Sequence, residues 1–224
     1  MAGAPALATD VAALFVDPRG GYPAAVAEWF DEKRDARTYT GDLPVVAHPP
    51  CQRWCRLAGL VEARWGHKRG EDGGLFASAL ATLRRVGGVL EHPAYSDAWA
   101  AYSLPRPPTG GAWVPGALEF EWTCYVEQWR YGHKAKKATW LYYVGLSKPF
   151  ALKWGRILDS KAMATWDAGI RRGPVALVSV SWCGNHVSSG EKRERLKKRD
   201  AIATPPEFRE VLLSLARHSQ VEPA

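Results

Sequence analysis

Two short apolar runs that each stop at a proline constrain the fold of the middle of the chain. "LPVVAH" runs into Pro49 and Pro50, and "VLEHP" ends at Pro93. Both runs predict strands, because proline lacks the N–H group that would continue a ladder of backbone hydrogen bonds. Between them, "EDGGLFASALATLRRVGG" has apolar residues at helical spacing and two terminal glycines, which predict an amphipathic helix. A strand, a helix and a second strand predict a βαβ unit with parallel strands.

The other segments extend this pattern to an α/β fold. Further strands are predicted for "VAALFVD" (11–17), "WTCYVEQWRYG" (122–132), "TWLYYVG" (139–145) and "PVALVSVSW" (174–182). We expect helices over 24–37, after Ser96 and over 204–218, the last with Thr204 and Glu207 as a capping box. Residues 59–70 are expected to form a loop. A length of 224 residues predicts one domain over residues 1–224.

The charge of the chain predicts a polyanionic partner. Thirty Lys and Arg against 23 Asp and Glu give a net charge of +7, much of it in "YGHKAKKATW" and "GEKRERLKKRD". A basic protein attracts nucleic acid through its long-range field, so we expect DNA as the partner and Lys134, Lys136 and Lys137 as phosphate contacts. The alternative is a basic surface that is merely solvated.

The amino-terminal sequence and the cysteines predict where in the cell the protein is located. No apolar run approaches the ~20 residues that cross a bilayer, and "MAGAPALATDVAALFVD" lacks the basic start of a secretory signal. We therefore expect a cytoplasmic protein with no membrane contact. Cys51, Cys55, Cys124 and Cys183 are expected to be free thiols in a reducing compartment.

Three reactive residue types follow predicted strands. Asp17, Cys51 and Glu91 each come at the carboxyl end of one. In open α/β sheets, ligands bind in the crevice beyond those ends. The three side chains are therefore expected to share a site.

Three motifs give the chain a family resemblance. "HPPCQRWCRLAG" resembles the Pro-Pro-Cys-Gln loop of DNA cytosine-C5 methyltransferases, "GGVLEHP" stands where these enzymes have a Glu-Asn-Val strand end, and "EQWRYG" resembles the start of their Gln-x-Arg-x-Arg motif. The motifs occur in the order of the family. The resemblance implies a Rossmann-like methyltransferase-type, mostly parallel sheet with flanking helices, reduced in size. It covers a catalytic core of about residues 40–145, and residues 150–224 add a strand, a basic segment and a helix.

The resemblance also implies a chemistry for four residues. Cys51 is expected to add as a thiolate to carbon 6 of cytosine, which activates carbon 5. Glu91 is expected to hold N3 of the ring, as a carboxylic acid whose pKa is raised by an apolar site. Arg130, supported by Gln128, is expected to hold the ring carbonyl and to lower the pKa of the thiol.

Substrate and cofactor contacts are expected around these residues. Pro50, Gln52, Trp54 and His92 flank the catalytic positions and are expected to contact the base, with Trp54 or Trp129 stacking on it.

The family uses S-adenosyl-L-methionine, for which Asp17 and Gly20 are the candidate contacts. The glycine turn that the family has after its first strand is replaced by "LFVDPRGGYP".

Three alternatives remain open. His48, Cys51, Cys55 and His67 are possible zinc ligands, although Cys-x3-Cys departs from the usual knuckle; the expected site holds no metal. A second alternative keeps the cysteine and glutamate pair for hydroxymethylation or deamination of a pyrimidine without S-adenosyl-L-methionine. The third is a relative that binds nucleic acid without catalysis.

Overall fold

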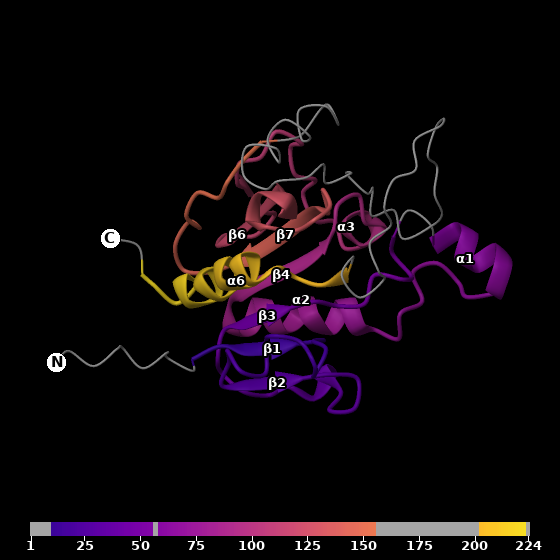
Figure 1. The fold of residues 1–224 in the computed structure, drawn as a ribbon, viewed down its shortest axis with the longest axis horizontal. Helices are drawn as coiled ribbons and strands as arrows, with labels where there is room; N and C mark the ends of the chain where they lie inside the picture. The colour runs from indigo at the N-terminus through magenta and orange to yellow at the C-terminus, as the bar shows by residue number, and fades with distance from the viewer. Residues whose placement is uncertain (1–9, 56–57, 156–201, 223–224) are drawn as a thin grey trace.

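The computed structural model describes residues 10–55, 58–155 and 202–222 of the chain. The strands of this part are β1 (Ala12–Leu14), β2 (Glu28–Phe30), β3 (Val45–Ala47), β4 (Gly88–Pro93), β5 (Val114–Pro115), β6 (Glu121–Glu127) and β7 (Ala138–Val144). The α-helices are α1 (Ala58–Trp65), α2 (Leu75–Val86), α3 (Asp97–Ala101) and α6 (Pro206–His218), and the 3-10 helices are η1 (Ala36–Thr38) and η2 (Gln128–Tyr131). The fold belongs to the α/β class (Figure 1).

The described strands form one seven-stranded mixed sheet in the order β2-β1-β3-β4-β7-β6-β5. Strands β2, β1, β3 and β4 run parallel, which confirms the βαβ unit made by β3, α2 and β4. From β7 onward the neighbours pair antiparallel, so the expectation of a mostly parallel sheet is wrong for this half. Strands β6 and β7 are joined by a short connection, and antiparallel pairs need no helical crossover.

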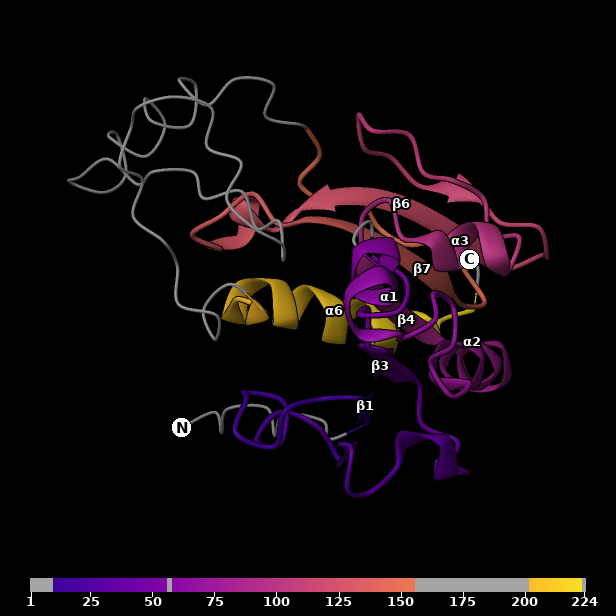
Figure 2. The same ribbon diagram turned by 90° about the vertical axis from the view of Figure 1, so that its right-hand side faces the viewer.

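Helices cover both faces of the sheet. Helix α6 lies on one face and α2 lies on the other, as Figure 2 shows for the region of β3 and β4. One core packs α2 and α3 against residues such as Leu14 and Leu90. The second core packs α6 against their neighbours Ala13 and Val89. Successive strand residues point to opposite faces of the sheet. Alternate residues of a strand therefore belong to the core under α2 and α3 or to the core under α6.

Helix α2 begins and ends where the sequence predicts. The Asp72 carboxylate accepts a hydrogen bond from the Phe76 backbone N–H at 2.9 Å, which satisfies a donor at the first turn. The helix ends at Gly87, whose φ of 76° is a conformation that glycine adopts without strain. At the next residue, Gly88, a Cβ atom would lie 2.0 Å from the Val45 carbonyl oxygen. This glycine therefore permits β3 and β4 to approach.

Several sequence predictions are wrong. Residues 24–37 form the edge strand β2 and η1 instead of a helix. After β2, the Asp31 carboxylate accepts the backbone N–H groups of Lys33 and Arg34 at 3.0 and 2.8 Å, and such side-chain hydrogen bonds compete with a helix. Residues 59–70 include most of α1. Helix α6 has Pro205 at its N-cap with no side-chain cap, so the predicted capping box is absent.

Some predictions lie outside the described residues. These are the strand over 174–182, the basic segment "GEKRERLKKRD" and Cys183. Helix α6 confirms the predicted final helix. No helix in residues 10–55, 58–155 and 202–222 has the length and apolar character needed to cross a membrane.

Candidate active site

Cys51 and Glu91 lie at the carboxyl ends of neighbouring parallel strands. Cys51 follows β3 after two prolines, and Glu91 lies within β4. These strands pair directly, so the sequence correctly predicts that they bring both residues to the same end of the sheet. Cys51 is partly exposed as a residue although its thiol is mostly buried, and Glu91 is only 9% exposed. The charge of Glu91 acts on the thiol.

The Glu91 carboxylate is held by groups from three different segments. One carboxylate oxygen, Oε2, lies 3.0 Å from His48 Nδ1. The other, Oε1, accepts a hydrogen bond from Gln128 Nε2 at 2.9 Å and a longer one from Thr139 Oγ1 at 3.4 Å. Gln128 also donates to Thr139 Oγ1 at 2.9 Å. The ends of β3, β6 and β7 thus converge on one buried carboxylate.

Tyr22 extends this network and fixes the orientation of His48. The Tyr22 hydroxyl lies 2.8 Å from His48 Nε2, and burial raises the pKa of Tyr22 well above its ordinary value. The hydroxyl therefore keeps its proton and donates to Nε2. His48 then carries a proton on Nδ1 and donates it to Glu91, since an ionised carboxylate only accepts.

The contacts of Glu91 keep it ionised, which corrects the expected raised pKa. Burial by itself raises the pKa of a carboxyl group. The hydrogen bond from His48 and the charges of Lys137, His48 and His92 outweigh burial here and lower the pKa of Glu91 to about 2. In the free protein Glu91 is therefore a carboxylate.

The Cys51 thiol is in the opposite state. Burial, together with the negative charges of Cys55 and Glu91, raises the pKa of Cys51 to about 12, while Lys137 opposes the rise. The expectation of a thiol activated in the free protein is therefore wrong. Activation of this sulfur requires a change in its surroundings when a ligand binds.

Lys137 supplies the cation that the sequence analysis expects from Arg130. The Lys137 ammonium donates to the carbonyls of Ile202 and Ala203, both at 2.9 Å. It acts electrostatically on both Glu91 and Cys51, and burial lowers the pKa of Lys137. Lys137 is partly exposed, and a phosphate contact stays a prediction for it.

Arg130 has other partners. Its guanidinium lies 4.6 Å from the centre of the Trp129 ring, and its Nε donates to the Gly155 carbonyl at 3.1 Å. No contact joins it to Glu91 in the described part of the chain. Gln128, two residues earlier, is fully buried and does contact Glu91.

The two tryptophans considered for stacking are buried in the protein. Trp54 is 6% exposed, packs against the Phe76 and Tyr102 rings and donates to Asp72 Oδ2 at 2.7 Å. Trp129 donates to Glu127 Oε2 at 2.8 Å. Neither ring offers a free face for a base, so their expected stacking role is corrected to a structural one.

The other expected substrate contacts lie in three different environments. His92 is fully buried, with its ring stacked on Trp99 and at the edge of Phe76, and burial lowers its pKa to about 4. A packed imidazole of this kind supports the core and does not reach a ligand. Pro50 is partly exposed and Gln52 is exposed, so both are accessible beside Cys51.

The two remaining lysines of the basic motif also differ. Lys134 is exposed, and a phosphate contact stays a prediction for it. Lys136 forms an ion pair at 3.0 Å with Glu127, whose side chain is inaccessible to solvent. Lys136 therefore neutralises a buried carboxylate.

The turn after β1 contains Asp17 and Gly20, the residues expected to contact S-adenosyl-L-methionine. Asp17 is exposed and its carboxylate accepts from Arg19 Nε at 3.1 Å. Gly20 is exposed in the same turn. Beside it, a Cβ on Gly21 would fall against the Arg209 guanidinium. The Arg209 guanidinium thus occupies the space beside Gly21.

The possible zinc ligands have other surroundings. His48 contacts Glu91 and Tyr22, and Cys51 and Cys55 are free thiols. Within the described ranges, no three His, Cys, Asp or Glu side chains gather where they could hold a metal ion.

The comparisons with known proteins add no relative. No protein-family model, no curated protein and no solved structure matches the chain. The function is therefore argued from the residues and their geometry.

Proposed function

We propose that the chain is a nucleic-acid-modifying enzyme that acts on cytosine, or a related pyrimidine, in DNA. The Cys51 sulfur attacks carbon 6 of a base taken out of the helix, and Glu91 holds N3 of the same ring. The proposal depends on one observation: Cys51, a partly exposed residue, and the buried carboxylate of Glu91 lie at the ends of adjacent parallel strands β3 and β4. Chemistry on a base requires such access, because the reacting atoms are stacked inside a duplex.

The electrostatics support activation by the substrate itself. In the free protein the ionised Glu91 holds the pKa of Cys51 high. A ring whose N3 shares a proton with Glu91 becomes more electrophilic at carbon 6. The shared proton also reduces the negative charge that opposes the thiolate, and Lys137 remains to stabilise it. His48, which donates to Glu91 from Nδ1, keeps its proton and orients the carboxylate, and the shared proton comes from solvent when the base binds.

A buried acceptor beside Glu91 supports an amino-bearing ring. Gln128 uses its Nε2 on Glu91 and Thr139. Its Oε1 is buried without a hydrogen-bond partner among the described residues. An unsatisfied buried acceptor is costly, and the exocyclic amino group of cytosine is next to N3. The amino group of a bound cytosine would satisfy this oxygen once binding exposes Gln128, which is fully buried in the free protein.

Methylation at carbon 5 is the reaction that the resemblance implies, with S-adenosyl-L-methionine as the donor. The sheet supports this class: β7 is antiparallel between β4 and β6 at one end of four parallel strands, with helices on both faces. We propose it as a reduced Rossmann-like methyltransferase-type sheet.

A second candidate is the SAM-independent hydroxymethylation or deamination of a pyrimidine by the same Cys51 and Glu91 pair. The observation that favours it is the turn after β1, where Arg209 fills the space beside Gly21. The addition of the thiolate is common to both reactions, so we derive no later step.

The test traps the covalent adduct. Duplex and single-stranded DNA containing 5-fluorocytosine are incubated with the protein, with and without S-adenosyl-L-methionine, and adducts are measured by denaturing electrophoresis and mass spectrometry. We expect adducts with the wild type and with the Cys55→Ser control, and none with Cys51→Ser. An adduct that needs the donor indicates methylation, and one that forms without it indicates the second candidate.

A folded wild-type protein that forms no adduct with either DNA would overturn the proposal. DNA binding that survives Cys51→Ala, without any change to the bases, would identify a non-catalytic binding protein. Mass spectrometry of nucleosides after expression gives the mass of any group that is added.

A further inference from the structure

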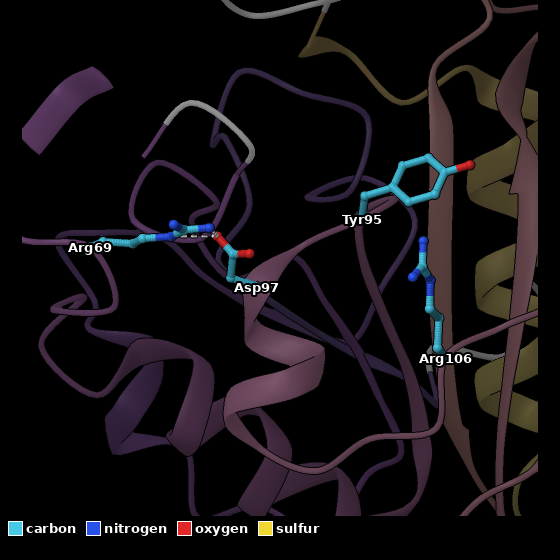
Figure 3. A pocket seen from close by; sticks show the side chains of 4 residues that line it. All are labelled: Arg69, Tyr95, Asp97 and Arg106. Atoms are coloured by element: carbon cyan, nitrogen blue, oxygen red, sulfur yellow. Dashed lines mark hydrogen bonds and ion pairs between the residues drawn. The ribbon is translucent and has the colours of Figure 1, made fainter. Parts of the chain in front are cut away.

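A cavity of about 470 Å³ lies at the carboxyl-end edge of β4 and has a basic and aromatic lining. Its walls are Arg69, Tyr95, Asp97 and Arg106 (Figure 3). Tyr95 and Asp97 come from the residues that directly follow β4, the strand that contains Glu91. The cavity therefore lies beyond the carboxyl end of β4.

The two arginines of this cavity have different partners. Arg69 Nε donates to Asp97 Oδ2 at 2.7 Å, so its charge is compensated. Arg106 instead packs on aromatic rings, 5.5 Å from the centre of Tyr95 and 5.9 Å from that of Trp140. The guanidinium of Arg106 has no hydrogen bond or ion pair to the residues that the structure describes. The lining thus has two guanidinium groups and one carboxylate, which leaves a positive charge for a ligand.

The rings also hold the Arg106 guanidinium in place. A guanidinium stacks on aromatic faces while its N–H groups remain available in the plane, where they match the oxygens of a phosphate. Figure 3 shows the Arg106 guanidinium extending toward the Tyr95 ring. A phosphate bound there would be held on an ordered side chain.

The segment that contains Cys51 connects the cavity to the active site. The Asp97 backbone N–H donates to the Trp54 carbonyl at 2.9 Å, and the Gly70 N–H donates to the Arg53 carbonyl at 2.9 Å. Residues 51–55 thus begin at the reactive thiol and end against the walls of the cavity.

The register of β4 and β7 places the two sites on opposite faces of the sheet edge. Glu91 pairs with Leu141, and the next pair is His92 with Trp140. Leu141 belongs to the core under α6, whereas Trp140 belongs to the core under α2 and α3. The cavity therefore lies across the edge from Glu91.

We infer that this cavity binds a phosphodiester group of the polynucleotide next to the nucleotide whose base reaches Cys51. The inference depends on the proposed function for the identity of the polymer. Arg106 binds the phosphate oxygens, and Tyr95 packs against the adjoining sugar or base. A phosphate group of a free nucleotide has the same chemistry, and the test separates the two sources.

The test compares Arg106→Gln with Lys33→Gln. Lys33 is exposed and follows the edge strand β2, so its variant removes the same charge far from the cavity. Affinity for single-stranded and duplex DNA is measured by fluorescence anisotropy over a range of salt concentrations, and dCMP is titrated in parallel. Thermal melting by circular dichroism verifies that both variants are folded.

We expect Arg106→Gln to weaken DNA binding by about tenfold at ~0.1 M salt and to reduce the salt slope by about 1, as for the loss of one phosphate contact. Lys33→Gln should change the affinity less than about twofold, and dCMP should show no binding that depends on Arg106. Equal affinities and slopes for the two variants would overturn the inference. Binding of dCMP that depends on Arg106, with unchanged DNA affinity, would replace it with a free nucleotide site.

Failure of the proposed function gives a different result. In one result, the wild type forms no adduct with 5-fluorocytosine while Arg106→Gln still lowers the DNA affinity and its salt slope. This result would support the phosphate site and contradict the Cys51 chemistry. If the wild type and Arg106→Gln form adducts equally well and have the same DNA affinity and salt slope, the result contradicts the phosphate site and supports the Cys51 chemistry. A wild type that binds no DNA would overturn both.

Discussion

His48 Nδ1 lies 3.0 Å from Glu91 Oε2 and joins the end of β3 to β4. His48 directly precedes the two prolines that lead to Cys51. One hydrogen bond therefore positions the catalytic carboxylate of the proposed mechanism and anchors the segment with the thiol. The predictions below separate its chemical role from its contribution to stability.

Glu91→Gln should abolish base modification and leave a folded protein. An amide keeps the size of the side chain but cannot share a proton with N3 of a ring as a carboxyl group does. We expect adduct formation to fall by about 100-fold or more, measured by the 5-fluorocytosine assay. Glu119→Gln, at an exposed position before β6, is the control. Equal adduct rates for both variants would remove Glu91 from the mechanism.

Lys137→Met should slow the addition of Cys51 and shift its pH dependence upward. The ammonium of Lys137 lowers the pKa of Cys51 against the effect of burial, and methionine keeps the length of the chain without the charge. We expect the adduct rate to fall about tenfold, with the rising limb of the pH profile displaced to higher pH. Lys33→Met is the matched control. An unchanged profile would contradict an electrostatic role for Lys137.

Acidification from pH 6.5 to about 4 should destabilise the protein because of His92. Burial lowers the pKa of His92 from 6.5 to about 4, so below pH 6.5 the unfolded chain takes up a proton that the folded protein does not bind. Stability is therefore lost as the pH falls from 6.5 toward 4, by about 3 kcal/mol in total. Urea unfolding at several pH values measures this loss.

His92→Gln should flatten stability across that window. A lower window, from about pH 4.5 to 2, should persist, because Glu91 has its pKa lowered from 4.5 to about 2 and loses its stabilising ionised form there. Glu91→Gln should remove the lower window alone. A slope between pH 6.5 and 4 that survives His92→Gln would contradict the assignment.

Trp54→Phe should reduce stability without reducing DNA affinity. The substitution removes the hydrogen bond to Asp72 and part of the packing against Phe76 and Tyr102, at a cost of about 1–3 kcal/mol in the free energy of unfolding. Anisotropy should give the wild-type affinity under conditions in which the variant is folded. Weaker DNA binding with unchanged stability would restore the stacking role.

The sequence is sufficient to predict the central βαβ unit and the position of Cys51 and Glu91 at the same end of the sheet. Both follow from local patterns: two strands that stop at prolines, and a helix that ends at glycine. When such strands are parallel neighbours, whatever follows them must share one end of the sheet. The sequence predicts Gln128 as a support for Arg130, whereas the structure places it against Glu91.

The partners of Glu91 from other segments depend on the order of the strands. Thr139 reaches Glu91 because β7 pairs with β4, and Tyr22 reaches His48 from the turn after β1. No local pattern specifies either contact. The position of Arg130 was misjudged for a geometric reason: residues two apart on a 3-10 helix point in different directions, so η2 buries Gln128 and turns Arg130 toward Gly155.

The spacing of apolar residues over 24–37 predicts a helix, but a three-residue edge strand such as β2 also satisfies this spacing. Short apolar stretches leave the choice between helix and strand open. It is settled here by the pairing of β2 with β1 and by the hydrogen bonds of Asp31. Tertiary pairing outweighed local propensity.

The hydrogen bonds from Lys137 to the carbonyls of Ile202 and Ala203 span 65 and 66 positions of sequence. These hydrogen bonds connect Lys137, the cation that acts on the Cys51 thiol, to the residues just before α6. Insertions, deletions or proteolytic cuts near residue 202 should therefore alter the pKa of the Cys51 thiol without changing Cys51, Glu91 or Lys137. The electrostatics around Cys51 thus depend on a segment far away in the sequence.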